Sequence, residues 1–275
     1  MKSNLRITPQ ELDEQTILPA TIETASQMFR EHGAIWLQNA LPKELVQRLQ
    51  IEYQEKYISQ PPGQLLKKHA LVGDQRLMVT VTIESAFNSI QLYANPILSS
   101  ILGSLLGHQY AISSFGSVVA FPGAESQAIH FDHPPLFEAE SDCVNLPPYA
   151  ITVVLPLVDL TPETGSTAIW EGTHASLGAR DSLRRRMEDQ DWSGSVHPLP
   201  KMGDVYLMDY RVIHGGMANE SDQPRPILYM VYGRPWFRDA FNFADQPPIQ
   251  FGPGEFKKVP KRNRGLFAAC QSKHL

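Results

Sequence analysis

Gln127-Ala128-Ile129-His130-Phe131-Asp132-His133 is the stretch of sequence from which the fold can be worked out. Its pattern predicts a β-strand, in which every second side chain lies on the same face. His130 and Asp132 therefore point the same way, so that an imidazole nitrogen and a carboxylate oxygen are neighbours on one surface. His133 points to the opposite face, where we expect it to pack rather than to act as a ligand.

The chain on both sides of this stretch, from about residue 110 onward, has the texture of a β-protein. Short β-type runs alternate with Pro, Gly, Asp and Asn, and the clearest are residues 117–121, 150–155, 204–208 and 227–232. They predict an antiparallel barrel or sandwich of roughly eight strands. Two insertions, 134–148 and 175–198, interrupt it. Insertions of this length are usually functional lids or disordered, and we expect residues 136–149 to fold over the site.

The first hundred residues have helical spacing instead. We expect helices over 21–32, 42–57 and 96–106, with Gly33 and Gly107 ending the first and the last. The sequence thus predicts a mainly β fold with a helical N-terminal buttress. We expect one domain, 1–275, with a helical part of about 1–108, a β core of about 109–240 and a C-terminal tail at the surface.

Composition limits the classes of function. The 275 residues are 42% apolar and 19% charged, with a net charge of −5 and a pI near 6.0. This balance suits a folded globule and does not suggest nucleic-acid binding. Two distant cysteines indicate neither a disulfide framework nor a thiolate zinc site, and no run of 18 apolar residues occurs. We expect a cytoplasmic protein with a small-molecule substrate, no membrane or nucleic-acid partner, and a monomeric or homodimeric state.

A third ligand would complete a metal site with His130 and Asp132. His214 is the best candidate, because a β-type run leads into it and Gly215-Gly216 allows close approach of backbone and ligand. Two imidazoles and one carboxylate that leave the other coordination positions open are typical of non-haem iron(II) oxygenases. Catalytic zinc accepts the same ligands.

Arg225 favours the iron interpretation. It follows His214 by 11 residues, across a turn that we expect to return it to the interior near the metal. There a guanidinium would clamp a carboxylate of a co-substrate, which zinc hydrolysis does not require. A zinc hydrolase or isomerase, and a catalytically silent cupin-like metal-binding or sensing protein, remain the alternatives.

At these residues the chain resembles the phytanoyl-CoA dioxygenase family of iron- and 2-oxoglutarate-dependent oxygenases. The resemblance covers most of the chain. It extends over residues 29–37, the helix 98–107, the HxD strand 122–133, the segment 165–174 with Thr173 where Ser is more usual, and the pair formed by His214-Gly215-Gly216 and Arg225-Pro226.

The resemblance implies a double-stranded β-helix, also called a jelly roll, of the cupin-like kind. It implies Fe(II) held by His130, Asp132 and His214, with 2-oxoglutarate and O2 as co-substrates and release of succinate and CO2. Gln127 and Thr167 match positions that often bind 2-oxoglutarate in the family, and we expect Arg76 to add a basic contact. The intact Asp132 carboxylate favours hydroxylation, desaturation or rearrangement over halogenation. The expected substrate is a small natural-product or lipid-like metabolite.

Overall fold

Alternation along the strands places side chains on two different faces of one large sheet. The computed structural model describes residues 3–60, 69–243 and 247–270. In β11 (Arg225–Gly233), Leu228 and Met230 join a core that includes the N-terminal helices, whereas Ile227 and Tyr229 line a cavity on the other face. One strand thus contributes both to the core and to the wall of the cavity.

The large sheet is antiparallel except for its first pair of strands, which is parallel. In spatial order its strands are β1 (Asn4–Arg6), β2 (Ala34–Gln38), β9 (Val205–Asp209), β7 (Ala150–Pro156), β11, β6 (Ala111–Ala120), β4 (Arg76–Thr80) and β3 (Ala70–Leu71).

A smaller sheet faces the cavity side of the large one. It contains the antiparallel pair β8 (Thr167–Trp170) and β10 (Ile213–Gly216), and single bridges join His130 to His214 and Val196 to Ile169. A separate parallel pair consists of β5 (Thr82–Ile83) and β12 (Gln250–Phe251).

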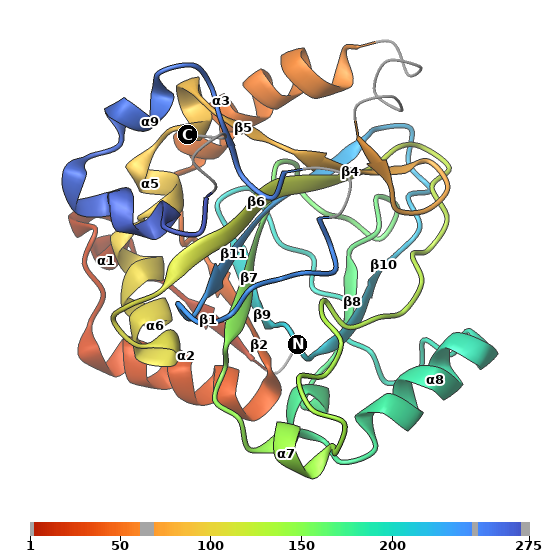
Figure 1. Cartoon of the computed structure of the whole chain (residues 1–275). Coiled ribbons are helices and arrows are strands. Elements are labelled where there is room, and N and C mark those ends of the chain that lie inside the picture. The colour runs from red at the N-terminus through yellow and green to blue at the C-terminus, as the bar shows by residue number, and fades with distance from the viewer. Residues whose placement is uncertain (1–2, 61–68, 244–246, 271–275) are drawn as a thin grey trace.

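Helices α1, α2, α5, α6 and α9 gather on the face of the large sheet opposite β8 and β10 (Figure 1). The helices are α1 (Pro9–Glu14), α2 (Pro19–His32), α3 (Lys43–Tyr53), α5 (Ile90–Tyr93), α6 (Pro96–Leu106), α7 (Ser141–Val144), α8 (Ala179–Asp189) and α9 (Glu255–Lys258). A π-helical turn, Gln54–Ile58, extends α3, and 3-10 turns occur at Ser85–Phe87, Thr173–Ala175 and Lys261–Phe267. Within the described ranges, none of these helices has the length and apolar character needed to cross a bilayer.

The three expected helices and the four clearest expected strands are present. Gly33 ends α2 with a φ of 72°, a left-handed conformation that glycine adopts without strain. The N-terminal part contains strands as well as helices, because β1, β2, β3 and β4 lie within the first 108 residues and extend the large sheet. The tail lies at the surface at Lys257, Lys258, Lys261 and Arg262, whereas Phe251 and Phe267 on either side of this basic stretch are buried in the main core.

The segment around His130 is not the regular strand that its sequence predicts. His130 exchanges backbone hydrogen bonds of 2.9 and 3.0 Å with His214, but this pairing does not continue toward Asp132. The next pair would need the Val212 N–H, which is already bonded to the Asp209 carbonyl in a turn. The chain therefore leaves the small sheet before it reaches Asp132.

The insertion that was expected to fold over the site, 136–149, contributes no residue to the wall of the cavity. It contains α7 and packs toward α8, where the Glu140 carboxylate accepts a backbone hydrogen bond from Gly178 near the start of the helix. Arg211 holds the C-terminal end of the insertion, because its guanidinium donates hydrogen bonds to the backbone carbonyls of Cys143 and Leu146.

Candidate metal and co-substrate site

His130, Asp132 and His214 meet at one point, as their spacing predicts. One possible ligand atom from each lies within 4.8 Å of the others, a separation that a single metal ion can span. The His214 Nε2 atom lies 3.4 Å from Asp132 Oδ1, and the two imidazole rings are 4.3 Å apart. The triad combines β10 of the small sheet with the irregular segment that the bridge at His130 ties to it.

Backbone carbonyls orient both imidazoles for metal binding. His130 Nδ1 lies 2.7 Å from the Ala128 carbonyl, and His214 Nδ1 lies 3.0 Å from the Val212 carbonyl. A carbonyl can only accept, so each Nδ1 carries a proton and Nε2 is the ring nitrogen that each histidine can offer to a metal. This second interaction is typical of histidines that bind metals.

Two side chains outside the triad hold Asp132. Thr152 of β7 donates a 2.7 Å hydrogen bond to Asp132 Oδ2, and Asn242 donates one of the same length to the Asp132 backbone carbonyl. Oδ2 is thereby engaged, whereas Oδ1 faces His214. The carboxylate is therefore oriented to offer one oxygen to an ion.

The pKa shifts of His130 and Asp132 favour the forms that bind a metal, whereas the shift of His214 favours its protonated form. Burial and the nearby His214 imidazole lower the pKa of His130 to about 4, so that its ring is neutral near pH 7. Burial alone would raise the pKa of Asp132, but the two histidines and Thr152 outweigh burial and lower it. The Asp132 carboxylate raises the pKa of His214 against the effect of burial. A neutral imidazole and an ionised carboxylate are the forms that bind metals.

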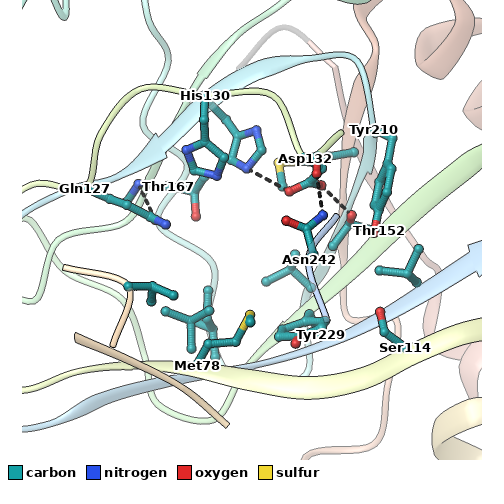
Figure 2. A pocket seen from close by; sticks show the side chains of 18 of the residues that line it. Met78, Ser114, Gln127, His130, Asp132, Thr152, Thr167, Tyr210, Tyr229 and Asn242 are labelled. Atoms are coloured by element: carbon teal, nitrogen blue, oxygen red, sulfur yellow. Dashed lines mark hydrogen bonds and ion pairs between the residues drawn. The ribbon is translucent and has the colours of Figure 1, made fainter. Parts of the chain in front are cut away.

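The triad borders a cavity of about 250 Å³ between the two sheets. Figure 2 shows Gln127 and Thr167 on one side of the triad, and Tyr210, Thr152 and Ser114 on the other. Arg76 and Arg225 also line this cavity. All seven sequence-predicted site residues therefore border the same space.

Arg76 and Arg225 are both buried, with 1% and 2% of their surface exposed, and no carboxylate within the described ranges pairs with either. Burial lowers the pKa of both to about 10, and for Arg76 the charge of Arg225 adds to the effect, so both stay cationic at neutral pH. Arg76 Nε and Nη1 and Arg225 Nε are buried without a hydrogen-bond partner. Two adjacent cations with free donors make a site for an anion that carries more than one oxygen.

Gln127 and Thr167 lie where they can complete such an anion site, but each already has a neighbour. Gln127 Oε1 accepts a 3.4 Å hydrogen bond from the Gly216 N–H. The Thr167 hydroxyl lies 2.6 Å from the hydroxyl of Tyr206, a cavity residue that the sequence did not single out. A Cβ at Gly216 would lie 2.8 Å from Arg76 Nη1, so this glycine makes room for a guanidinium rather than for a ligand.

Sequence reasoning missed Tyr206, Thr152, Ser114 and Asn242. Tyr206 and Thr152 lie within strands that were predicted, and Ser114 lies in β6 just before the predicted run 117–121, so strand alternation, once the cavity face was known, was the signal that could have found them. Asn242 lies outside regular structure and carries no such signal. Of the aromatic side chains near the end of β11, Tyr229 lines the cavity, whereas Trp236 is 62% exposed.

The class that this fold and this site define is that of the non-haem iron, 2-oxoglutarate-dependent dioxygenases. The chain belongs to the phytanoyl-CoA dioxygenase family, whose model matches residues 29–227. Family membership confirms the resemblance seen in the sequence and the class of enzyme, which uses Fe(II), 2-oxoglutarate and O2.

Curated relatives are fungal dioxygenases. The chain is 26% identical over 251 residues to dioxygenase af480 of Aspergillus fumigatus, covering 86% of this chain and 78% of that protein. It is 24% identical over 210 residues to dioxygenase trt7 of Aspergillus terreus, covering 75% and 71%. The iron/alpha-ketoglutarate-dependent dioxygenase penM of Penicillium thymicola is 26% identical over 220 residues, covering 74% and 65%.

Solved structures confirm the fold. The epimerase SnoN, in complex with Fe3+, alpha-ketoglutarate and nogalamycin RO, superimposes with a TM-score of 0.62 at 18% identity, covering 86% of this chain and 95% of that one. HygX of Streptomyces hygroscopicus, with nickel, 2-oxoglutarate and hygromycin B bound, gives a TM-score of 0.60 at 15% identity, covering 80% and 90%. The expected jelly-roll fold with flanking helices is therefore confirmed.

Proposed function

We propose that this protein is an Fe(II)- and 2-oxoglutarate-dependent dioxygenase that hydroxylates, desaturates or rearranges a small natural-product or lipid-like metabolite, with release of succinate and CO2. His130, Asp132 and His214 hold the iron. The observation that carries the proposal is the meeting of this triad with two buried guanidiniums that lack an acidic partner, in one cavity.

Each residue has a distinct task. Arg225 pairs with the carboxylate of 2-oxoglutarate that points away from the metal, and Arg76, Gln127 and Thr167 add hydrogen bonds around the same molecule. Iron with 2-oxoglutarate supplies the oxidising power drawn from O2, whereas the protein supplies position and shelter. Apolar walls that include Ile227 and Met208 restrict water around the metal.

Relatives support the choice of substrate class. SnoN is an epimerase from nogalamycin biosynthesis, and HygX has been solved with hygromycin B bound. We extend from them only the general class, a small organic natural product. One catalytic domain spanning 1–275, the cytoplasmic location and the monomeric or homodimeric state stay predictions from the sequence.

Release of succinate tests the proposal. Purified protein with Fe(II), 2-oxoglutarate and O2, assayed across a panel of candidate metabolites, is expected to release succinate faster with at least one of them. His130→Ala or Asp132→Ala should abolish the release. Arg225→Ala should raise the 2-oxoglutarate concentration for half-maximal rate by roughly 30-fold or more, the cost of losing a buried charged contact of about 2–5 kcal/mol.

The alternatives give different results. A silent metal-binding protein would bind Fe(II) and release no succinate under any condition. A zinc hydrolase would be indifferent to 2-oxoglutarate, and its activity would survive Arg225→Ala. Either pattern contradicts the proposed function.

A further inference from the structure

The cavity has a second end, distant from the two guanidiniums. Alternate residues of β11 line its length, beginning with Arg225 and ending with Val231. Six residues of an antiparallel strand span about 20 Å. Val231 pairs with Ser114 of β6, whereas Arg225 pairs with Ala120, so Ser114 lies at the opposite end of the floor from the cationic group.

Ser114 is a buried polar group without a partner. Its residue has 0% of its surface exposed, and its hydroxyl has no hydrogen-bond partner in the described part of the chain although the side chain lines the cavity. Buried hydroxyls normally form a hydrogen bond, and leaving one unmade costs about 1–3 kcal/mol. An unpaired hydroxyl at a cavity wall is therefore set up for a ligand oxygen.

Tyr229 shapes the floor beside Ser114. Its ring lies across Gly116, where a Cβ would be only 2.6 Å from the Tyr229 hydroxyl and 2.7 Å from the Val79 carbonyl. Glycine at this position thus allows the phenol to lie flat along the floor. Burial raises the pKa of Tyr229, and Asp132 adds to the effect, so the phenol stays neutral. Tyr229 offers an aromatic surface and a hydroxyl, and no charge.

Charge is distributed unevenly along the cavity. Among the described residues that line it, the Arg and Asp side chains are Arg76 and Arg225 at one end and Asp132 in the metal triad. The other end has Ser114, Tyr229 and Val231, whereas Met78 and Val118 lie between the two ends, in register with Ile227. A carboxylate or phosphate enclosed there would lack a cation, and burying an unpaired charge is strongly unfavourable.

We propose that this neutral end binds the substrate through an apolar ring or chain that carries an uncharged oxygen, a hydroxyl or keto group, hydrogen-bonded to Ser114. The inference rests on the proposed function, because it assigns the cationic end to 2-oxoglutarate. It makes Ser114 a specificity-determining residue that contacts the substrate without binding the metal.

Matched bicyclic probes test this assignment without turnover. Protein loaded with Ni(II) and 2-oxoglutarate is titrated calorimetrically with trans-2-decalone, trans-2-decalol and trans-decalin-2-carboxylate. We expect the ketone or the alcohol to bind at least tenfold more tightly than the carboxylate. Ser114→Ala should weaken that binding by up to about tenfold, the value of one hydrogen bond of about 1–1.5 kcal/mol, and should leave the affinity for 2-oxoglutarate unchanged.

Ser113→Ala is the matched control. Ser113 is the neighbouring serine, does not line the cavity, and donates its hydroxyl to the Val231 carbonyl, so its variant should bind all three probes like the parent. Equal or tighter binding of the carboxylate, no effect of Ser114→Ala, or no binding of the ketone and the alcohol while 2-oxoglutarate still binds would each overturn the inference. Failure of the parent protein to bind 2-oxoglutarate would contradict the proposed function itself.

Discussion

Thr152 shows how a single residue of the large sheet positions a candidate metal ligand, Asp132, on the irregular segment beside the small sheet. Its hydroxyl donates a hydrogen bond to Asp132 Oδ2, so that Asp132 Oδ1 remains beside His214 Nε2. The irregular backbone at Asp132 cannot orient the carboxylate through a strand ladder. Side-chain contacts must do so, and partners of this kind are important for metal affinity.

Thr152→Val should therefore weaken metal binding while keeping the shape of the side chain. We expect the Ni(II) dissociation constant, measured calorimetrically, to rise by roughly 10- to 100-fold. Thr152→Ser, which keeps the hydroxyl, should restore most of the affinity. Equal affinities of the parent and the valine variant would remove Thr152 from this positioning role.

At the scale of elements, Arg211 ties the insertion 134–148 to the sheet. Its guanidinium pairs with the fully buried Asp209 carboxylate at 2.8 Å and donates to the carbonyls of Cys143 and Leu146. This contact with Asp209 raises the pKa of Arg211 despite burial. A planar fork of donors serves three acceptors at once, which a lysine ammonium cannot reproduce.

Arg211→Lys should loosen the insertion without affecting the cavity. Loss of one or two hydrogen bonds of about 1 kcal/mol each should raise the rate of chymotrypsin cleavage at the half-exposed Phe137 by roughly tenfold. The affinity for 2-oxoglutarate should stay unchanged. Arg184→Lys, a matched change at an exposed ion pair of α8, should leave cleavage unaltered. Protection of Phe137 by metal and 2-oxoglutarate would instead indicate that the insertion folds over the site.

Elements differ in how much of them the sequence could predict. α2, α6, β7 and β11 followed from local spacing and caps, because their periodic patterns agree with their environments. The irregular course at Asp132 did not, since it depends on the Val212 N–H being used in a turn. β1 and β4 could not be recognised as parts of the large sheet, because edge pairing depends on distant partners. The grouping of the triad and Arg225 around one cavity could be predicted because their residue types and spacing are specific even where the local backbone is not regular.

For the whole molecule, the site joins the two sheets. The triad lies at the small sheet, whereas Arg225 and Arg76 belong to the large one. A molecule of 2-oxoglutarate held at both ends would therefore link the sheets across the cavity. In the ligand-free protein, the same two guanidiniums repel each other and lack a counter-charge, so the anion site carries a cost in stability.

Thermal unfolding should separate these contributions. We expect Ni(II) to raise the Tm of the parent protein, and 2-oxoglutarate at a hundredfold excess over its dissociation constant to add about 2.7 kcal/mol, or roughly 5–10 °C for a chain of this size. Arg225→Met should stabilise the ligand-free protein by on the order of 1 kcal/mol and so raise its Tm, because it removes a buried charge without an acidic partner whose hydrogen bonds to backbone carbonyls measure 3.3 to 3.5 Å. The Arg225→Met variant should keep the increase in Tm that Ni(II) produces and lose the increase that 2-oxoglutarate produces.

Arg234→Met is the control. It removes an arginine bonded to backbone carbonyls outside this cavity, so it should lower the Tm and keep both increases. A 2-oxoglutarate increment that survives Arg225→Met would mean that the co-substrate does not bridge the sheets through this residue.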